Sequence, residues 1–391
     1  ANLYGSGGAP LCSIERGRGN LKEAEAILGN SFTMLLLTGV CITVLGILCR
    51  RPFLYAFGAS DATYPFADRY LSIYLCGTLF VMLEMGLNAF INAQGFAKTG
   101  MLTVLIGAVA NIALDPLFIF VFRMGIAGAA LASVLAQFLS AAWTLWFLFG
   151  KTAILRITKA GMRLRGERVG KIVTLGFSGF VMQFTNSVVT LACNSTLQSC
   201  GGDLYVEVMT IISSIREVIM MPIHGITAGS QPVISFNFGA KKYDRVLKAV
   251  RFMGMLLIGY TAIAWGAVHL FPGFFIRIFR KDATLIAATT PSMRLYYFGF
   301  IFMALQFTGQ TTFQSLGRAK NAIFFSLFRK VVIVVPLTLL LPGLWSLGVK
   351  GVFLAEPISN FIGGSACFLT MLLIVVPDMR RRMADTSQGG V

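Results

Sequence analysis

One apolar run, residues 99–122, limits what this chain can fold into. It is long enough to cross a bilayer as a helix, which takes about 20 residues, and Asp115 is its only charged residue. A carboxylate in such a span costs roughly 2.5–3.5 kcal/mol on insertion scales, so it must be satisfied inside a bundle. Asn111 lies four residues earlier on the same helical face, and Pro116 frees the carbonyl of Ile112. This pattern indicates either a cation or proton site, or a structural hydrogen bond between packed helices.

The composition places the rest of the chain in the membrane as well. The chain is 56% hydrophobic and 13% charged, whereas soluble domains average about 25% charged residues. The net charge of +17 would suit nucleic-acid binding, but the basic residues lie in short segments between apolar runs, so no nucleic-acid partner is predicted. We expect an all-α polytopic membrane protein. Its predicted spans are 29–49, 66–93, 99–122, 126–149, 170–197, 204–232, 249–276, 286–314, 321–341 and 348–376.

The distribution of Lys and Arg predicts the orientation of these spans. One side of the membrane carries more than twice as many basic residues as the other, and that side is predicted to be cytoplasmic. Arg329 and Lys330 are counted with that side, although they fall within the span 321–341. The C-terminus is predicted to lie on the same side.

Short motifs recur at an offset of 222 or 223 residues. Residues 10, 13 and 17 (Pro, Ser, Gly) recur at 232, 235 and 239, and the stretch 125–132 resembles 348–355. Both copies keep one orientation, which indicates two pseudo-symmetric bundles, an arrangement found in transporters. The second copy has six predicted spans and the first has four, so the repeat predicts roughly fifty residues with two spans ahead of Ala1. The predicted parts are an N-terminal lobe (1–149), a basic cytoplasmic linker (150–171), a C-terminal lobe (172–376) and a cytoplasmic tail (377–391).

Polar residues inside the predicted spans are the candidates for binding. Gln306, Gln310 and Gln314 repeat every four residues, and this stripe either lines a wet cavity or hydrogen-bonds neighbouring helices. Glu84 is a second acid, which could titrate or could pair with Arg216. The candidates for a substrate cleft are Glu84, Asn88, Gln137, Gln183, Asn186, Gln306, Gln310 and Gln314.

No pattern in the sequence indicates an enzyme. The GxSxG, HExxH and P-loop motifs are missing, so the chain itself cannot be an ATP-driven pump. The cysteines form no CxxC or metal-ligand spacing, and we interpret those inside apolar runs as packing residues. No resident cofactor is predicted, so uphill work requires an ion gradient or a partner subunit.

Three stretches resemble the multidrug and toxic compound extrusion (MATE) family: NIALDPLFIF (111–120), GITAGSQPVISFNFGAKKYDR (225–245) and QGFAKT (94–99). The resemblance implies twelve spans in two six-helix lobes around a cleft, with the first two spans preceding Ala1. It implies export of amphipathic organic cations, in exchange for protons or sodium ions, by alternating access. It also implies a monomer in the inner or plasma membrane of a bacterial cell, with membrane lipid and small-molecule organic cations as its partners.

The family's coupling site carries over in part. The DinF-like branch uses an Asn and an Asp four apart on the fifth span and a hydroxyl residue on the sixth, which match Asn111, Asp115 and Ser133. Its first-span Asp has no counterpart in this chain. The resemblance thus implies a proton or a sodium ion at Asp115 as the coupling ion. The NorM-like branch places acids on the seventh and tenth spans, where this chain has amides.

Two further observations bear on these hypotheses. A lipid-linked oligosaccharide flippase of related fold is the main alternative, and it would need a cationic cleft, whereas Arg216 alone is predicted at depth. Under the offset of 222, Asn111 and Asp115 correspond to the apolar Ile333 and Leu337. A structural hydrogen bond common to both lobes would be expected twice, so this asymmetry favours a cation-handling role for Asp115.

Overall fold

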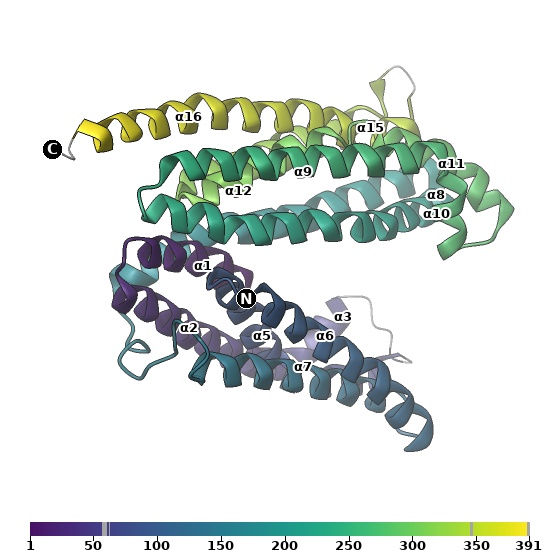
Figure 1. Ribbon diagram of the computed structural model, residues 1–391. Helices are drawn as coiled ribbons and strands as arrows, with labels where there is room; N and C mark the ends of the chain where they lie inside the picture. The colour runs from purple at the N-terminus through teal and green to yellow at the C-terminus, as the bar shows by residue number, and fades with distance from the viewer. Residues whose placement is uncertain (57–60, 62, 345–346, 389–391) are drawn as a thin grey trace. The chain divides into compact units, whose positions relative to one another are not determined.

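The computed structural model describes residues 1–56, 61, 63–344 and 347–388, and the chain divides into two compact units. Unit 1 comprises Ala1–Gly176 and unit 2 comprises Phe177–Val391. Every regular element among the described residues is helical (Figure 1). The predicted fold class, an all-α membrane protein made of two helical bundles, is confirmed.

Unit 1 packs its helices around leucine, isoleucine and phenylalanine side chains such as Leu87 and Phe90. Helix α1 packs against α2 and α5, and α7 packs against α4, α5 and α6. The Asn20 side chain caps α2 by accepting a hydrogen bond from the backbone N–H of Glu23 at 3.3 Å. The elements are α1 (Asn2–Gly17), α2 (Leu21–Leu48), α3 (Arg50–Ala56), α4 (Tyr64–Cys76), α5 (Thr78–Ala93), α6 (Ala97–Pro116), the π-helix η1 (Leu117–Val121), α7 (Ile126–Phe149) and the start of α8 (Gly166–Gly239).

Unit 2 contains the rest of α8 and the helices that follow it. Gly202 has φ +67° and ψ −166°, a conformation open to glycine, and it breaks α8 into two helical segments. Helix α12 packs against both α9 and α16, which run alongside it (Figure 1). The further elements are α9 (Tyr243–Leu270), α10 (Pro272–Phe279), α11 (Ala283–Tyr297), α12 (Phe302–Ser315), α13 (Ala319–Leu327), η2 (Phe328–Val334), α14 (Val335–Leu340), α15 (Val349–Ser359), η4 (Asn360–Gly364) and α16 (Ser365–Gln388).

Each of the ten predicted spans falls on helices, while α1 and α3 lie outside them. Six continuous helices among the described residues are long and apolar enough to cross a membrane, and the pair α4–α5, bent by 48°, makes a seventh. The two predicted spans 170–197 and 204–232 correspond to the two segments of α8, and 286–314 corresponds to α11 and α12. Apolar side chains on these helices stay exposed, for example Ile112 at 72% and Ile263 at 74%, as expected for contact with lipid.

Local geometry repeats between the units at the offsets seen in the sequence. The backbone φ is positive at Gly95 and Gly317, 222 residues apart, and at Gly125 and Gly348, 223 residues apart. A hydrogen bond repeats as well. The Ser13 hydroxyl donates to the carbonyl of Ala93 at 3.3 Å, and its counterpart Ser235 donates to that of Ser315 at 2.8 Å. The two units are therefore copies of one helical pattern, and residue positions in one can be related to positions in the other.

The segment 150–171, predicted as a linker, packs onto unit 1. The Asn30 amide donates to the carbonyls of Gly161 at 2.8 Å and Arg163 at 3.0 Å, and its oxygen accepts from the N–H of Arg165 at 3.0 Å. Ala153, Leu155 and Ile157 are buried in the core of unit 1. The segment is thus an integral part of unit 1.

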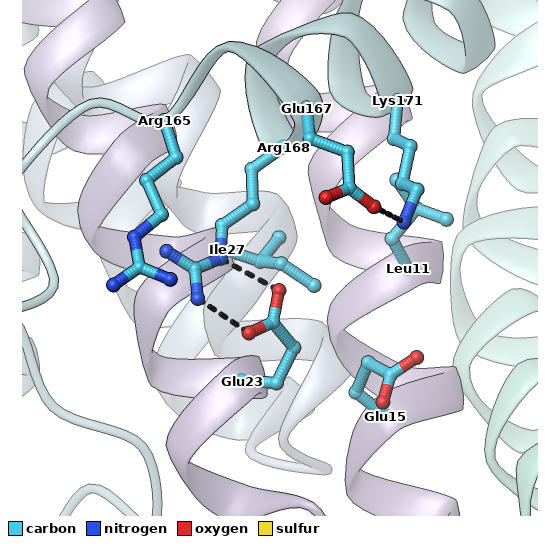
Figure 2. Close-up of a pocket in the computed structure, with 8 residues that line it drawn as sticks. All are labelled: Leu11, Glu15, Glu23, Ile27, Arg165, Glu167, Arg168 and Lys171. Carbon is cyan, nitrogen blue, oxygen red and sulfur yellow. Dashed lines mark hydrogen bonds and ion pairs between the residues drawn. The ribbon is translucent and has the colours of Figure 1, made fainter.

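An ion pair at the end of this segment joins it to α2. The Arg168 guanidinium donates two hydrogen bonds to the Glu23 carboxylate, at 2.6 and 2.5 Å (Figure 2). This contact raises the pKa of Arg168. Glu167 and Lys171 form a second, exposed pair at 2.6 Å, which lowers the pKa of the Glu167 carboxyl. The two pairs line a pocket of about 290 Å³ with Glu15 and Arg165 (Figure 2).

Candidate functional site

The predicted coupling residues lie where α6 meets α7 in unit 1. Asn111 donates a hydrogen bond from its side-chain amide to the Ser133 hydroxyl at 3.4 Å. Asp115 follows one turn later on α6, and its Oδ1 is buried without a hydrogen-bond partner within the described structure. A buried carboxylate oxygen is costly to leave unpaired, so this atom is suited to take up a proton or a cation.

The sequence places Asp115 at an irregular point of its helix. Pro116 ends the α-helical part of α6 and has no N–H to donate, and the π-helix η1 follows at once. In η1 the N–H of Phe122 bonds the carbonyl of Leu117, five residues back, at 2.9 Å. π-Helical turns inside α-helices are frequent at functional sites, because they redirect side chains and free backbone carbonyls.

A cavity of about 290 Å³ lies beside Asn111. Four polar residues that the sequence singled out line it, Glu84 on α5, Asn111 on α6, and Ser133 and Gln137 on α7. Gln137 donates to the Tyr74 hydroxyl at 3.3 Å, while its own Oε1 has no partner among the described residues. The cavity therefore combines one carboxyl group with several oxygen atoms that could accept hydrogen bonds or coordinate a hard cation. Asp115 does not line this cavity.

Asn88 does not join this group. It lies one turn further along α5, near the start of α6, where a Cβ placed on Gly100 would come within 2.9 Å of the Asn88 Oδ1. That oxygen is buried and has no partner in the described part of the chain. Asn88 and Glu84 thus face different parts of the contact between α5 and α6.

In unit 2 the predicted glutamine stripe contacts neighbouring helices. Gln306 and Gln310 are 6% and 4% exposed, and Gln310 donates to the carbonyl of Ala322 at 2.9 Å. Gln314 donates to the Ser178 hydroxyl at 3.2 Å. Within unit 2, these bonds are of the kind expected for amides that pack helices together. Gln183 is exposed, and Asn186 lines a small cavity of unit 2.

The main feature that sequence reasoning missed is a buried charge cluster, defined as Arg329, Lys330 and Glu356. The Lys330 ammonium lies 3.2 Å from Glu356 Oε1, and the Arg329 guanidinium lies 3.3 Å from the same oxygen. Arg329 also donates to the side-chain oxygen of Asn360. η2 carries the two cations and α15 carries the acid, and the three residues are only 6%, 2% and 5% exposed.

This cluster corrects two predictions. The assignment of Arg329 and Lys330 to the cytoplasmic side was wrong, because both side chains are buried within the helix bundle of unit 2. The expectation that Arg216 alone is a basic residue at depth was wrong for the same reason. One signal was available in the sequence: at the offset of 222, Arg329 and Lys330 fall at Gly107 and Ala108, in the middle of a span.

Comparisons with known proteins show which family and which relatives this chain resembles. The MatE family model matches residues 2–117 and 179–340. The chain is 24% identical over 376 residues to the "Multidrug export protein MepA" of Staphylococcus saprophyticus, an alignment that covers 96% of this chain and 81% of the relative. The protein of the same name from Staphylococcus aureus is 24% identical over 396 residues, which cover 99% of this chain and 84% of the relative.

Solved structures show the same fold. The structure entitled "Crystal structure of MATE in the bent conformation" aligns with a TM-score of 0.92 at 21% identity, covering 98% of this chain and 85% of that chain. An "Outward-facing conformation of a multidrug resistance MATE family transporter of the MOP superfamily" aligns with a TM-score of 0.91 at 20% identity, covering 96% of this chain and 84% of that chain.

Proposed function

Because this chain belongs to the MatE family, we propose that it exports amphipathic organic cations across a membrane in exchange for protons or sodium ions. The printed names of the matched relatives support export of several compounds, since they are multidrug export proteins. They lend no support to the flippase alternative. Like those relatives, the chain is not an enzyme.

The observation that carries the proposal is the unpaired Oδ1 of Asp115, one turn from the Asn111–Ser133 hydrogen bond. An ion that binds Asp115 would satisfy this buried oxygen, with the Asn111 carbonyl and the Ser133 hydroxyl as neutral ligands. Oxygen ligands of this kind suit a proton or a hard cation such as sodium. Binding there would couple to transport if the inward-open and outward-open forms differ in their affinity for the ion.

Glu84 is a reason to expect a cationic substrate or ion in the cavity beside Asn111. It is the carboxyl group of the 290 Å³ cavity, and no ion pair of Glu84 is found within the described residues of unit 1. A negative side chain in an otherwise uncharged cavity attracts cations and repels anions, because the low dielectric of the surroundings strengthens both effects. The cavity volume of about 290 Å³ lies just below the range of about 300–1,000 Å³ that is typical of ligand pockets.

The proposal is tested by Asp115→Asn in cells that express the full chain and are loaded with ethidium, a fluorescent amphipathic cation. The variant keeps the size of the side chain and removes its titratable group, so we expect efflux to fall at least tenfold at unchanged expression. Asp244→Asn makes the same substitution at an exposed position of α9 and should extrude ethidium at the wild-type rate. Wild-type efflux by the Asp115 variant would exclude this residue from coupling.

A further inference from the structure

A small cavity lies beside the buried charge cluster of unit 2. Its volume is about 20 Å³, on the scale of a single small occupant, and Arg216, Tyr296, Lys330 and Glu356 line it. The Arg216 guanidinium donates to the Tyr296 hydroxyl at 3.3 Å, but its Nε is buried without a partner in the described part of unit 2. Two residues with hydrogen-bond donors, Arg216 and Lys330, therefore line this cavity, and one donor of Arg216 is unsatisfied. The remaining polar side chains of its wall are Asn186, Thr190, Cys193, Ser213 and Thr338.

The charges around the cavity do not balance. Arg216, Arg329 and Lys330 carry positive charge, and Glu356 is the carboxylate that both cations of the cluster contact. Glu217 is next to Arg216 in sequence, but it is exposed and points about 100° away on the helix. Unpaired charge inside a membrane-spanning bundle is expensive, so a net positive cluster requires a negative partner or the loss of a proton. Arginine does not lose its proton in proteins, so a net positive charge remains even if Lys330 were neutral.

The corresponding position in unit 1 shows that the cluster is specific to unit 2. At the repeat offsets, Arg329 and Lys330 replace Gly107 and Ala108, which line the open 290 Å³ cavity of unit 1. The glycine at this helix contact also changes sides: it lies on one helix in unit 1 and on the facing helix in unit 2. In unit 1 a Cβ on Gly107 would meet the Ser140 hydroxyl, whereas in unit 2 a Cβ on Gly363 would lie 2.8 Å from the Arg329 side chain. At these matched positions, unit 1 has an open cavity with an acidic residue, whereas unit 2 has a nearly filled cavity with a basic cluster.

We propose that unit 2 binds one small inorganic anion, of the size of chloride, in the cavity between Arg216 and Lys330. The anion would accept hydrogen bonds from the free Nε–H of Arg216 and from the Lys330 ammonium, while Glu356 keeps its contacts with the cluster. The cavity volume limits the ligand to a single small ion, since a carboxylate carried by a larger molecule would not fit in about 20 Å³. This site does not depend on the cation-coupling role proposed for unit 1.

The test is the thermal stability of the purified full chain in detergent, with chloride titrated against gluconate at constant sodium and constant ionic strength. A ligand that binds only the folded protein raises Tm in a saturable way. We expect a rise of about 5 °C at a chloride concentration a hundred times the Kd. Bromide should replace chloride, and acetate should not. Equal Tm in chloride and gluconate overturns the proposal, and so does an equal effect of acetate.

Two variants place the effect at this cavity. Arg216→Gln removes the unsatisfied donor at a half-buried position, and we expect it to abolish the chloride-dependent rise in Tm. Arg251→Gln makes the same change at an exposed position of α9 and should keep the full rise. A chloride response that survives Arg216→Gln would show that the anion binds elsewhere. A response lost in both variants would show a general effect of surface charge.

Discussion

Removing the acid of the buried charge cluster should strongly destabilise unit 2. Glu356→Gln leaves Arg329 and Lys330 in place, 6% and 2% exposed, without the carboxylate that both of them contact. Breaking a buried ion pair in this way costs about 3–5 kcal/mol, because a buried charge is left uncompensated. For a unit of this size, each kcal/mol lowers Tm by about 2–4 °C, so we expect a fall of about 6–20 °C.

The assay is thermal unfolding of the purified chain in detergent, followed by far-UV circular dichroism. Glu207→Gln is a matched control, because Glu207 pairs with Arg280 at 3.2 Å and both side chains are exposed, at 42% and 61%. An exposed pair contributes about 0–1 kcal/mol, so this variant should unfold close to wild type. A fall in the Tm of Glu356→Gln of clearly less than about 6 °C would refute the electrostatic reasoning.

Three further outcomes are expected. Asn30→Ala removes three hydrogen bonds to the segment 150–171, so trypsin should cut at Arg163 or Arg165 several times faster than in wild type. An unchanged cleavage rate would contradict the packing of this segment against α2. Gly176→Val should lower stability by about 1–3 kcal/mol, because a Cβ there meets the backbone of Leu3, whereas Gly170→Val on the same helix meets nothing within 4 Å and should leave Tm unchanged. Ser133→Ala should weaken binding of the coupling ion about tenfold, measured as the ion concentration that half-saturates efflux; an unchanged value would remove Ser133 from the site.

The fold was predictable because membrane helices leave strong signals in a sequence. A span must be long and apolar, so all ten apolar runs fall on helices, and the break in α8 falls at a glycine, Gly202. The repeat was visible because glycines with positive φ must recur wherever the backbone geometry recurs, as Gly95 and Gly317 do.

The candidate site was predictable in part. Asn111 and Ser133 were placed on facing helices, and Glu84 and Gln137 line the same cavity. The buried charge cluster was missed because Arg329 and Lys330 were counted with the cytoplasmic basic residues, although they lie in the middle of the predicted span 321–341. Their burial depends on Glu356, which is 26 residues from Lys330 in sequence, so the pairing is a tertiary contact that no local pattern reveals.

The central claim is that Asp115 binds the coupling ion, and displacement of that ion by substrate tests it most directly. Ethidium is added to the purified full chain in weakly buffered, sodium-free detergent solution, and released protons are counted with a pH indicator. A parallel titration measures whether sodium weakens ethidium binding. We expect wild type to release protons on binding ethidium, or to lose ethidium affinity as sodium rises, and Asp115→Asn to do neither. If Asp115→Asn matches wild type in both titrations, Asp115 is not the coupling residue.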